Sequence, residues 1–333
     1  SDVSPFDSVP AAGFDTNANA SGIVPLPGRA TGSGSRLALD PAQNNAFRAV
    51  NEAWRAGGTV RYGKQNGQGR YIVSGVSQTK MNEWVEQLAL QVARTGESGD
   101  VEVRSRVALY QPWQASIDAG WTQWLLESYG FDFTNIRNAD FKTGELLKRF
   151  DVIVMASDRP GTIKDGHAEG SVPPRYTGGL GATGIRNLDA FVQGGGTLVC
   201  LNQSSDFAIA ELNLPVKNVV KGLDRKVYFT GGSILEVDTD SAHPVMAGMP
   251  DKSAIFVWRS PVFTALENFK GKALAKYRNS GSPLRSGYLL GEKQINGYAA
   301  AMDVQHGKGH VILLGFRPQW RGQPFGTFRV VFN

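Results

Sequence analysis

The chain of 333 residues contains one cysteine and four histidines, and its apolar residues form no long uninterrupted run. The single thiol, Cys200, excludes an internal disulfide and a zinc site built from cysteines. No apolar stretch reaches the roughly 18 residues that a membrane-spanning helix needs, so we expect no membrane partner. Lysines and arginines exceed acidic residues by only 5 and form neither a run nor a face interleaved with aromatic residues. This distribution argues against a nucleic-acid partner.

The overall composition is that of a globular protein, with 41% hydrophobic and 20% charged residues. The length suggests about two domains of roughly 150 residues each. The 40 glycines exceed the usual share of about 7% and indicate many tight turns. The chain begins Ser1-Asp2-Val3 without a signal peptide, which we interpret as a processed or truncated product.

Changes in composition divide the chain into three parts. Residues 1–35 are rich in Pro, Gly, Ala and Ser and predict an extended linker. Residues 36–104 predict a small α/β unit in which two strands, 59–63 and 70–75, lie between two helices. The first of these helices is expected to open at Pro41, and the second to cover residues 78–94, in the order strand-helix-strand-strand-helix-strand.

Residues 105–333 alternate strands with helices. We predict strands at 106–110, 131–137, 151–156 and 197–201, separated by helices at 118–129, 143–150 and 181–193. This alternation is typical of an α/β three-layer sandwich with a mostly parallel, doubly wound sheet. A β-rich insertion is expected at about 216–300, after which a hairpin of strands 299–304 and 311–315 returns to the main sheet.

Five separated segments resemble one known module. They are Arg106-Val-Ala-Leu-Tyr-Gln-Pro-Trp113, Asp118-Ala-Gly-Trp-Thr-Gln-Trp124, Asp151-Val-Ile-Val154, Gly194-Gly-Gly-Thr-Leu-Val-Cys-Leu-Asn202 and Gly315-Phe-Arg-Pro-Gln-Trp-Arg-Gly322. Together they look like the region that follows the catalytic domain in bacterial zinc carboxypeptidases of the carboxypeptidase A-like family. That region has a class I glutamine-amidotransferase-like, flavodoxin-like fold, and the likeness covers most of residues 36–333.

The resemblance implies a role without chemistry of its own. The family's peptidase domain, with its His-x-x-Glu and distal His zinc signature, would precede this chain, and that signature is absent here. We therefore expect a non-catalytic accessory module of a secreted or periplasmic zinc carboxypeptidase, which shapes substrate access or assembly. The expected partner is that metallopeptidase's catalytic domain, and no cofactor is expected in this chain.

The one cysteine does not stand where an amidotransferase nucleophile stands. A working thiol needs a strained strand-to-helix turn with neighbouring glycines, whereas Cys200 lies inside the strand between Val199 and Leu201. The turn would fall near Asn202-Gln203-Ser204, and no His-x-Glu pair follows to serve as base. The amidotransferase triad carries over at no position, so we predict no catalytic residue.

Two further motifs lack the context that their chemistry needs. His306 and His310 are four residues apart, but the adjacent glycines place them on a hairpin turn, so we expect surface residues and no metal site. The run Gly179-Leu-Gly-Ala-Thr-Gly184 matches a dinucleotide motif, yet a long loop separates it from the preceding strand. We interpret these glycines as a tight turn into a helix.

The carboxyl ends of the predicted parallel strands offer one candidate ligand site, because ligands of doubly wound sheets bind there. Its residues would be Trp113, Asp158, Asn202, Gln203, Arg317, Trp320 and Arg321. Aromatic, amide, carboxylate and guanidinium groups together suit a peptide, a sugar or a carboxylate. The structural alternative is that Trp113, Trp121, Trp124 and Trp320 pack a domain interface, while Asp118 caps the helix that begins at Ala119.

Two other functions stay open beside the accessory module. One is a stand-alone protein that binds peptide or carbohydrate at that crevice. The other is a divergent hydrolase that uses the corner formed by residues 202–205.

Overall fold

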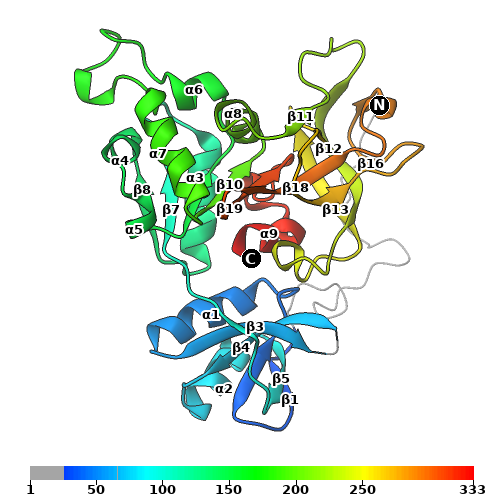
Figure 1. Cartoon of the computed structure of the whole chain (residues 1–333). Coiled ribbons are helices and arrows are strands. Elements are labelled where there is room, and N and C mark those ends of the chain that lie inside the picture. The colour runs from blue at the N-terminus through cyan, green and yellow to red at the C-terminus, as the bar shows by residue number, and fades with distance from the viewer. Residues whose placement is uncertain (1–25, 66) are drawn as a thin grey trace, which may run out of the picture.

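The computed structural model describes residues 26–65 and 67–333, which form a small six-stranded unit beneath a larger part built on a 13-stranded sheet (Figure 1). Most of the predicted linker, residues 1–25, lies outside the described residues. The remainder of the linker contains strand β1 (Arg29–Gly32), which pairs in parallel with β5 (Gln91–Thr95) at the edge of the small sheet. The small unit therefore begins before residue 36.

The small unit has the predicted order of elements followed by one additional strand, β6, and two of the predicted boundaries are corrected. Its elements are β2 (Arg36–Leu39), α1 (Asn45–Arg55), β3 (Thr59–Gln65), β4 (Gln68–Ser74), α2 (Gln78–Gln87), β5, and β6 (Val101–Glu102). Helix α1 begins at Asn45 rather than at Pro41. The second helix ends at Gln87 instead of Arg94, because Ala89 takes a left-handed φ of 53° and the chain turns into β5.

The larger part begins with five parallel strands in the order β8-β7-β9-β10-β19. They are β7 (Val107–Tyr110), β8 (Phe133–Ile136), β9 (Val152–Met155), β10 (Thr197–Leu201) and β19 (Gly309–Leu314). The helices between them are α3 (Ile117–Ser128), α4 (Asn138–Thr143), α5 (Leu146–Arg149), α6 (Pro160–Lys164), α7 (Gly181–Gln193) and α8 (Ser204–Glu211). The predicted alternation of strands and helices is confirmed.

The β-rich segment extends the same sheet with antiparallel strands, β18, β15, β12 and β13, beyond β19. Its strands are β11 (Val216–Asn218), β12 (Phe229–Thr239), β13 (Lys252–Trp258), β14 (Phe263–Ala265), β15 (Gly271–Lys276), β16 (Leu284–Ser286), β17 (Leu289–Leu290) and β18 (Ala299–His306). The hairpin β18–β19 rejoins the main sheet as predicted. The expectation of a mostly parallel sheet is wrong, because antiparallel pairings make up half of the main path.

Short helical turns and the last helix complete the chain. They are η1 (Pro174–Tyr176), η2 (Pro244–Met246), η3 (Glu292–Gln294), η4 (Trp320–Gly322), η5 (Phe325–Thr327) and α9 (Arg329–Phe332).

The two faces of the parallel strands are covered unequally. Crossovers between parallel strands are right-handed. Because β8 and β9 lie on opposite sides of β7, the crossover from β7 to β8 places α3 on one face of the sheet, and the later crossovers place α4 to α8 on the other face. The second group packs on Tyr110, Met155 and Cys200 in one core. The α3 face packs Leu126 of α3 and Val330 of α9 against the sheet in a second core. The protein is thus a mixed α/β structure.

A third core joins the small unit to the larger part. Phe47 and Trp84 of the small unit share it with Tyr129, Phe328 and Phe332, which lie outside residues 36–104. The phenyl rings of Phe47 and Phe332 lie 5.0 Å apart between centroids. The small unit is therefore packed on the rest of the chain rather than separated from it.

Candidate functional site

The turn between β10 and α8 has the geometry of a nucleophile elbow but carries an amide. Asn202 has a φ of 53°, a left-handed conformation that Asn tolerates better than most residues. Its side chain is fully buried, and Nδ2 donates to Ser157 Oγ at 3.1 Å. Its Oδ1 accepts a hydrogen bond from Ser260 Oγ at 2.6 Å. The amide therefore ties the end of β9, the end of β10 and the loop after β13 together.

The nucleophilic side chains near this elbow are enclosed and already hydrogen-bonded. Cys200 is fully buried inside β10, and burial raises the pKa of its thiol. Ser204 Oγ lies 2.9 Å from the carbonyl oxygen of Leu201 and 3.0 Å from that of Met155, and these two acceptors share its single proton. Ser205 Oγ donates to the carbonyl of Cys200 at 3.3 Å. The side chains of Cys200, Ser204 and Ser205 therefore stabilise the turn between β10 and α8, and none of them is exposed as a nucleophile.

Trp113 lies just after the carboxyl end of β7, and its side chain is 37% exposed. The guanidinium carbon of Arg137 lies 4.3 Å from the centroid of its ring, and Tyr176 meets the ring edge-on at 4.7 Å. Asp158 is half-buried, and its Oδ1 accepts a hydrogen bond from the backbone of Arg159 at 2.8 Å. Burial raises the pKa of Asp158 and so favours its neutral form.

A second aromatic group surrounds Arg317. Its guanidinium carbon lies 4.8 Å from the ring of Trp320 and 5.3 Å from that of Trp258. Arg321 covers Trp320 at 5.2 Å and is exposed. Arg317 and Arg321 thus both contact the ring of Trp320, and Arg317 also forms an ion pair with Asp118.

Two of the predicted ligand-binding residues need correction. Asn202 is fully buried and Arg317 is only 6% exposed, so both hold the protein together and neither meets a ligand directly. Trp113, Asp158, Gln203, Trp320 and Arg321 stay predictions.

The structural alternative is corrected for Trp113, Trp124 and Asp118, while it stays a prediction for Trp121 and Trp320. Trp113 and Trp124 are exposed by 37% and 42%, so within residues 26–65 and 67–333 they do not pack a domain interface. Asp118 does not cap α3; the Oγ of Ser116 accepts the bond from the backbone of Ala119 at 3.3 Å.

The glycine motif before α7 is explained by packing. A Cβ at Gly179 would lie 2.4 Å from the carbonyl oxygen of Ile163, and Gly181 has a φ of 60°. The glycines thus allow the chain to pass close to α6 and turn into α7, as the sequence suggested.

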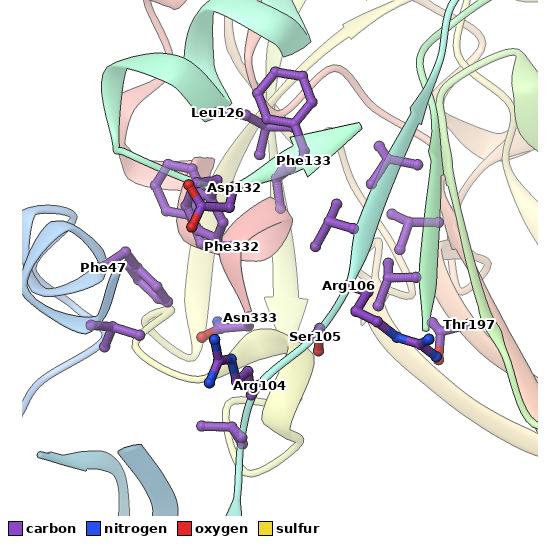
Figure 2. A pocket seen from close by; sticks show the side chains of 18 of the residues that line it. Phe47, Arg104, Ser105, Arg106, Leu126, Asp132, Phe133, Thr197, Phe332 and Asn333 are labelled. Carbon is purple, nitrogen blue, oxygen red and sulfur yellow. The ribbon is translucent and has the colours of Figure 1, made fainter. Parts of the chain in front are cut away.

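A large cavity lies elsewhere, at the amino ends of the parallel strands on the α3 face. Its volume is about 890 Å³, and Val107, Val152 and Val199 of the main sheet line it and form what we call its floor. Figure 2 shows part of its lining, with Phe47, Thr197 and Phe332 among the labelled side chains. Phe47 of α1 and Phe332 of α9 contribute to its walls. None of the predicted site residues lines it. The sequence reasoning missed it because its walls come from segments that only the tertiary structure brings together.

A hydrogen-bonded group of three side chains lines one part of this cavity. His310 Nδ1 lies 2.8 Å from Asp303 Oδ1, and His243 Nε2 lies 3.3 Å from Asp303 Oδ2. The backbone N–H of Val245 donates to His243 Nδ1, so the proton of that ring is on Nε2. Burial raises the pKa of Asp303, but the hydrogen bonds from His243 and His310 outweigh it, and the net pKa is lowered.

The prediction that the hairpin histidines are surface turn residues is only partly right. His310 is 48% exposed but belongs to β19, and His306 ends β18 with its Nε2 2.6 Å from Asp189 Oδ1. Among the residues that the structure describes, no group of three or more His, Cys, Asp or Glu is arranged to hold a metal ion. In the same residues, no helix is both long and apolar enough to cross a membrane.

The comparisons with known proteins are distant. No protein-family model matches the chain, and no curated protein is similar to it in sequence. A solved protein described as ThuA-like, from Bacteroides uniformis, is 13% identical with a TM-score of 0.38, covering 68% of this chain and 88% of its own. PurLQS from Thermotoga maritima is 11% identical with a TM-score of 0.42, covering 69% and 96%. The β-galactosidase from Bacillus circulans sp. alkalophilus is 13% identical with a TM-score of 0.41, covering 69% and 31%. No activity follows from likenesses at this level.

Proposed function

We propose that this chain is a non-catalytic accessory module with a glutamine-amidotransferase-like, flavodoxin-like fold, and that it works beside the catalytic domain of a zinc carboxypeptidase. The fold is supported by the strand order β8-β7-β9-β10-β19, which is that of flavodoxin-like sheets. The link to carboxypeptidases, and a secreted or periplasmic location, are supported by the resemblance of the five sequence segments alone.

The observation that carries the non-catalytic role is the amide at the elbow. An amidotransferase places its thiol at this turn, and a serine hydrolase its hydroxyl. Asn202 occupies the turn here, and hydrogen bonds to Ser157 and Ser260 engage both ends of its side chain. The module would therefore act through its surfaces, by shaping substrate access to the peptidase or by assembly with it.

A stand-alone binding protein for peptide or carbohydrate is the second candidate. It is favoured by the exposed ring of Trp113, which stands beside Arg137, and by the exposed guanidinium of Arg321 beside Trp320. Flat aromatic rings beside guanidinium groups are suited to stacking and to hydrogen bonding with such ligands. The divergent hydrolase is disfavoured, since the hydroxyls of Ser204 and Ser205 are fully buried.

The proposal is tested by adding the purified chain to the peptidase domain to which it would belong. We expect the chain to change the kcat/KM of that domain on a peptide substrate, and Trp113→Ala to weaken the effect. The chain alone should turn over neither glutamine nor p-nitrophenyl acetate. Turnover that Ser204→Ala abolishes would contradict the non-catalytic role.

Genomic sequence tests the parent protein separately. A reading frame without a zinc peptidase domain before Ser1 would contradict the carboxypeptidase link. In that case, binding of short peptides or oligosaccharides that is lost in Trp113→Ala would support the second candidate.

A further inference from the structure

We propose that the cavity between the small unit and the main sheet binds an amphipathic carboxylic acid. Its apolar body would lie on the valines of the sheet, and its carboxylate would meet Arg104. This proposal is independent of the accessory role, because it concerns the opposite end of the parallel strands.

The floor of the cavity is a continuous β-branched surface. Val107 pairs in register with Val152, and Val199 pairs with Val154 on one side and Ile312 on the other. Neighbouring strands are about 4.8 Å apart, so these side chains form an unbroken apolar patch across four strands. Val107, Val152 and Val199 are only half-buried, although valines in a parallel sheet are normally covered on both faces.

The half-covered floor follows from the topology. Five helices, α4 to α8, lie on the other face, while this face has α3 and the four-residue α9. The small unit bridges the remaining gap with Phe47 and Trp54 of α1. The cavity volume of about 890 Å³ falls within the range of about 300 to 1,000 Å³ that is typical of small-molecule sites.

The charges that line the cavity favour an anion. Arg55 pairs with Asp132 at 2.9 Å, Arg149 with Asp140 at 2.9 Å, and Arg106 with Asp151 at 2.7 Å. Asp303 is engaged by two histidines.

Arg104 also lines the cavity, and it forms no ion pair with any residue in 26–65 or 67–333. Arg104 and Asn333 both line the cavity, and in Figure 2 Arg106 points toward Thr197. Arg104 is therefore a cation without a carboxylate partner among the described residues, and it stands beside an apolar surface.

The polar end of the floor limits the length of the apolar body. Thr197 and His310 are register partners on β10 and β19, and they continue the row that Val107 and Val152 begin. Asp303 orients the ring of His310 through Nδ1, which leaves Nε2 available. The apolar body is thus expected to lie over β7, β9 and β10.

Decanoate is the probe, and decanol is its uncharged counterpart of equal chain length. Isothermal titration of the full chain, below the critical micelle concentration, should show binding of decanoate at least tenfold tighter than that of decanol. Arg104→Ala should remove this preference. The matched control, Arg186→Ala, changes an exposed arginine that does not line the cavity and should leave both affinities unchanged.

Filling the cavity tests its location. Val199→Phe should abolish binding of both probes, and Val107→Phe provides a second such variant if the first does not fold as judged by circular dichroism. Equal affinity of decanoate for the wild type, Arg104→Ala and the filled variants would overturn the proposal, as would the absence of binding. A dimer that light scattering detects in the wild type and not in Val199→Phe would also overturn it, because a second copy would then be the occupant.

Discussion

Asp118, in the first turn of α3, forms an ion pair with Arg317, which lies 199 residues further along the chain after β19. The side chains of Arg317 and Asp118 are only 7% and 10% exposed. Trp258 and Trp320 lie against the same guanidinium. Together these contacts join the start of α3, the end of β13 and the segment after β19 at the carboxyl ends of the parallel strands. The three segments are far apart in the sequence.

Breaking this pair is expected to destabilise the protein strongly. Arg317→Ala leaves the carboxylate of Asp118 buried without its partner, which typically costs about 3–5 kcal/mol. The double variant Asp118→Asn with Arg317→Met should recover part of that loss, because no buried charge remains. Urea unfolding measures both effects. Lys148→Ala, which removes the exposed pair with Glu145, is the control and should change stability by less than about 1 kcal/mol.

The thiol of Cys200 is expected to be unreactive in the folded protein. It is fully buried, and burial raises its pKa, so both access and thiolate formation are suppressed. Iodoacetamide at pH 8 should modify the chain only after unfolding in guanidinium chloride, as measured by mass spectrometry. Rapid modification of the folded chain would mean that β10 is more accessible than its packing indicates.

Stability should fall in acid because of Asp303. Its pKa is lowered in the folded state, so the group stabilises the protein above its unfolded pKa of about 3.9 and loses that contribution as pH falls through the folded value. Asp303→Asn should lower the free energy of unfolding by about 1–3 kcal/mol at pH 7 and by less near pH 3. Urea unfolding across this range checks the slope. A loss that is equal at both pH values would contradict the role of the charge.

The small unit and the larger part are expected to unfold together. Phe328 is fully buried in the core that both share, and its ring lies 6.1 Å from that of Tyr129 between centroids. Phe328→Ala should cost about 3–5 kcal/mol. Calorimetry of the wild type should show one transition, and the variant should lower its midpoint. A separate transition for residues 29–102 would show that the small unit folds on its own.

The elements with strong local signals could be predicted. Helix α7 and strand β10 have the bounds that the sequence indicated, because Gly194-Gly195-Gly196 ends the helix and a run of apolar residues follows. The helix predicted over 78–94 was too long. Leu88 and Val92 fit its period, but Val92 belongs to β5, which pairs with β1 and β2. Pairing between distant strands overrode the local pattern there.

The candidate sites, too, could be predicted from the sequence only in part. The position of the elbow at Asn202 followed from the sequence, since a strand runs directly into a helix at that point. The hydrogen bonds from Asn202 to Ser157 and Ser260 could not be predicted, because those serines are 45 and 58 residues away along the chain. The cavity could not be found from the sequence either, since Phe47, Val107 and Phe332 share no local motif.

The sequence by itself determined the α/β alternation and the place of Cys200 inside a buried strand, because each depends on residues that are neighbours in the chain. The tertiary structure alone decided that the β-rich segment joins the main sheet, that Arg317 reaches Asp118, and that one face of the parallel strands is left half-covered above Val152. Hydrophobic periodicity encodes which side of an element is buried. Which distant segment covers that side is settled only when the whole chain packs.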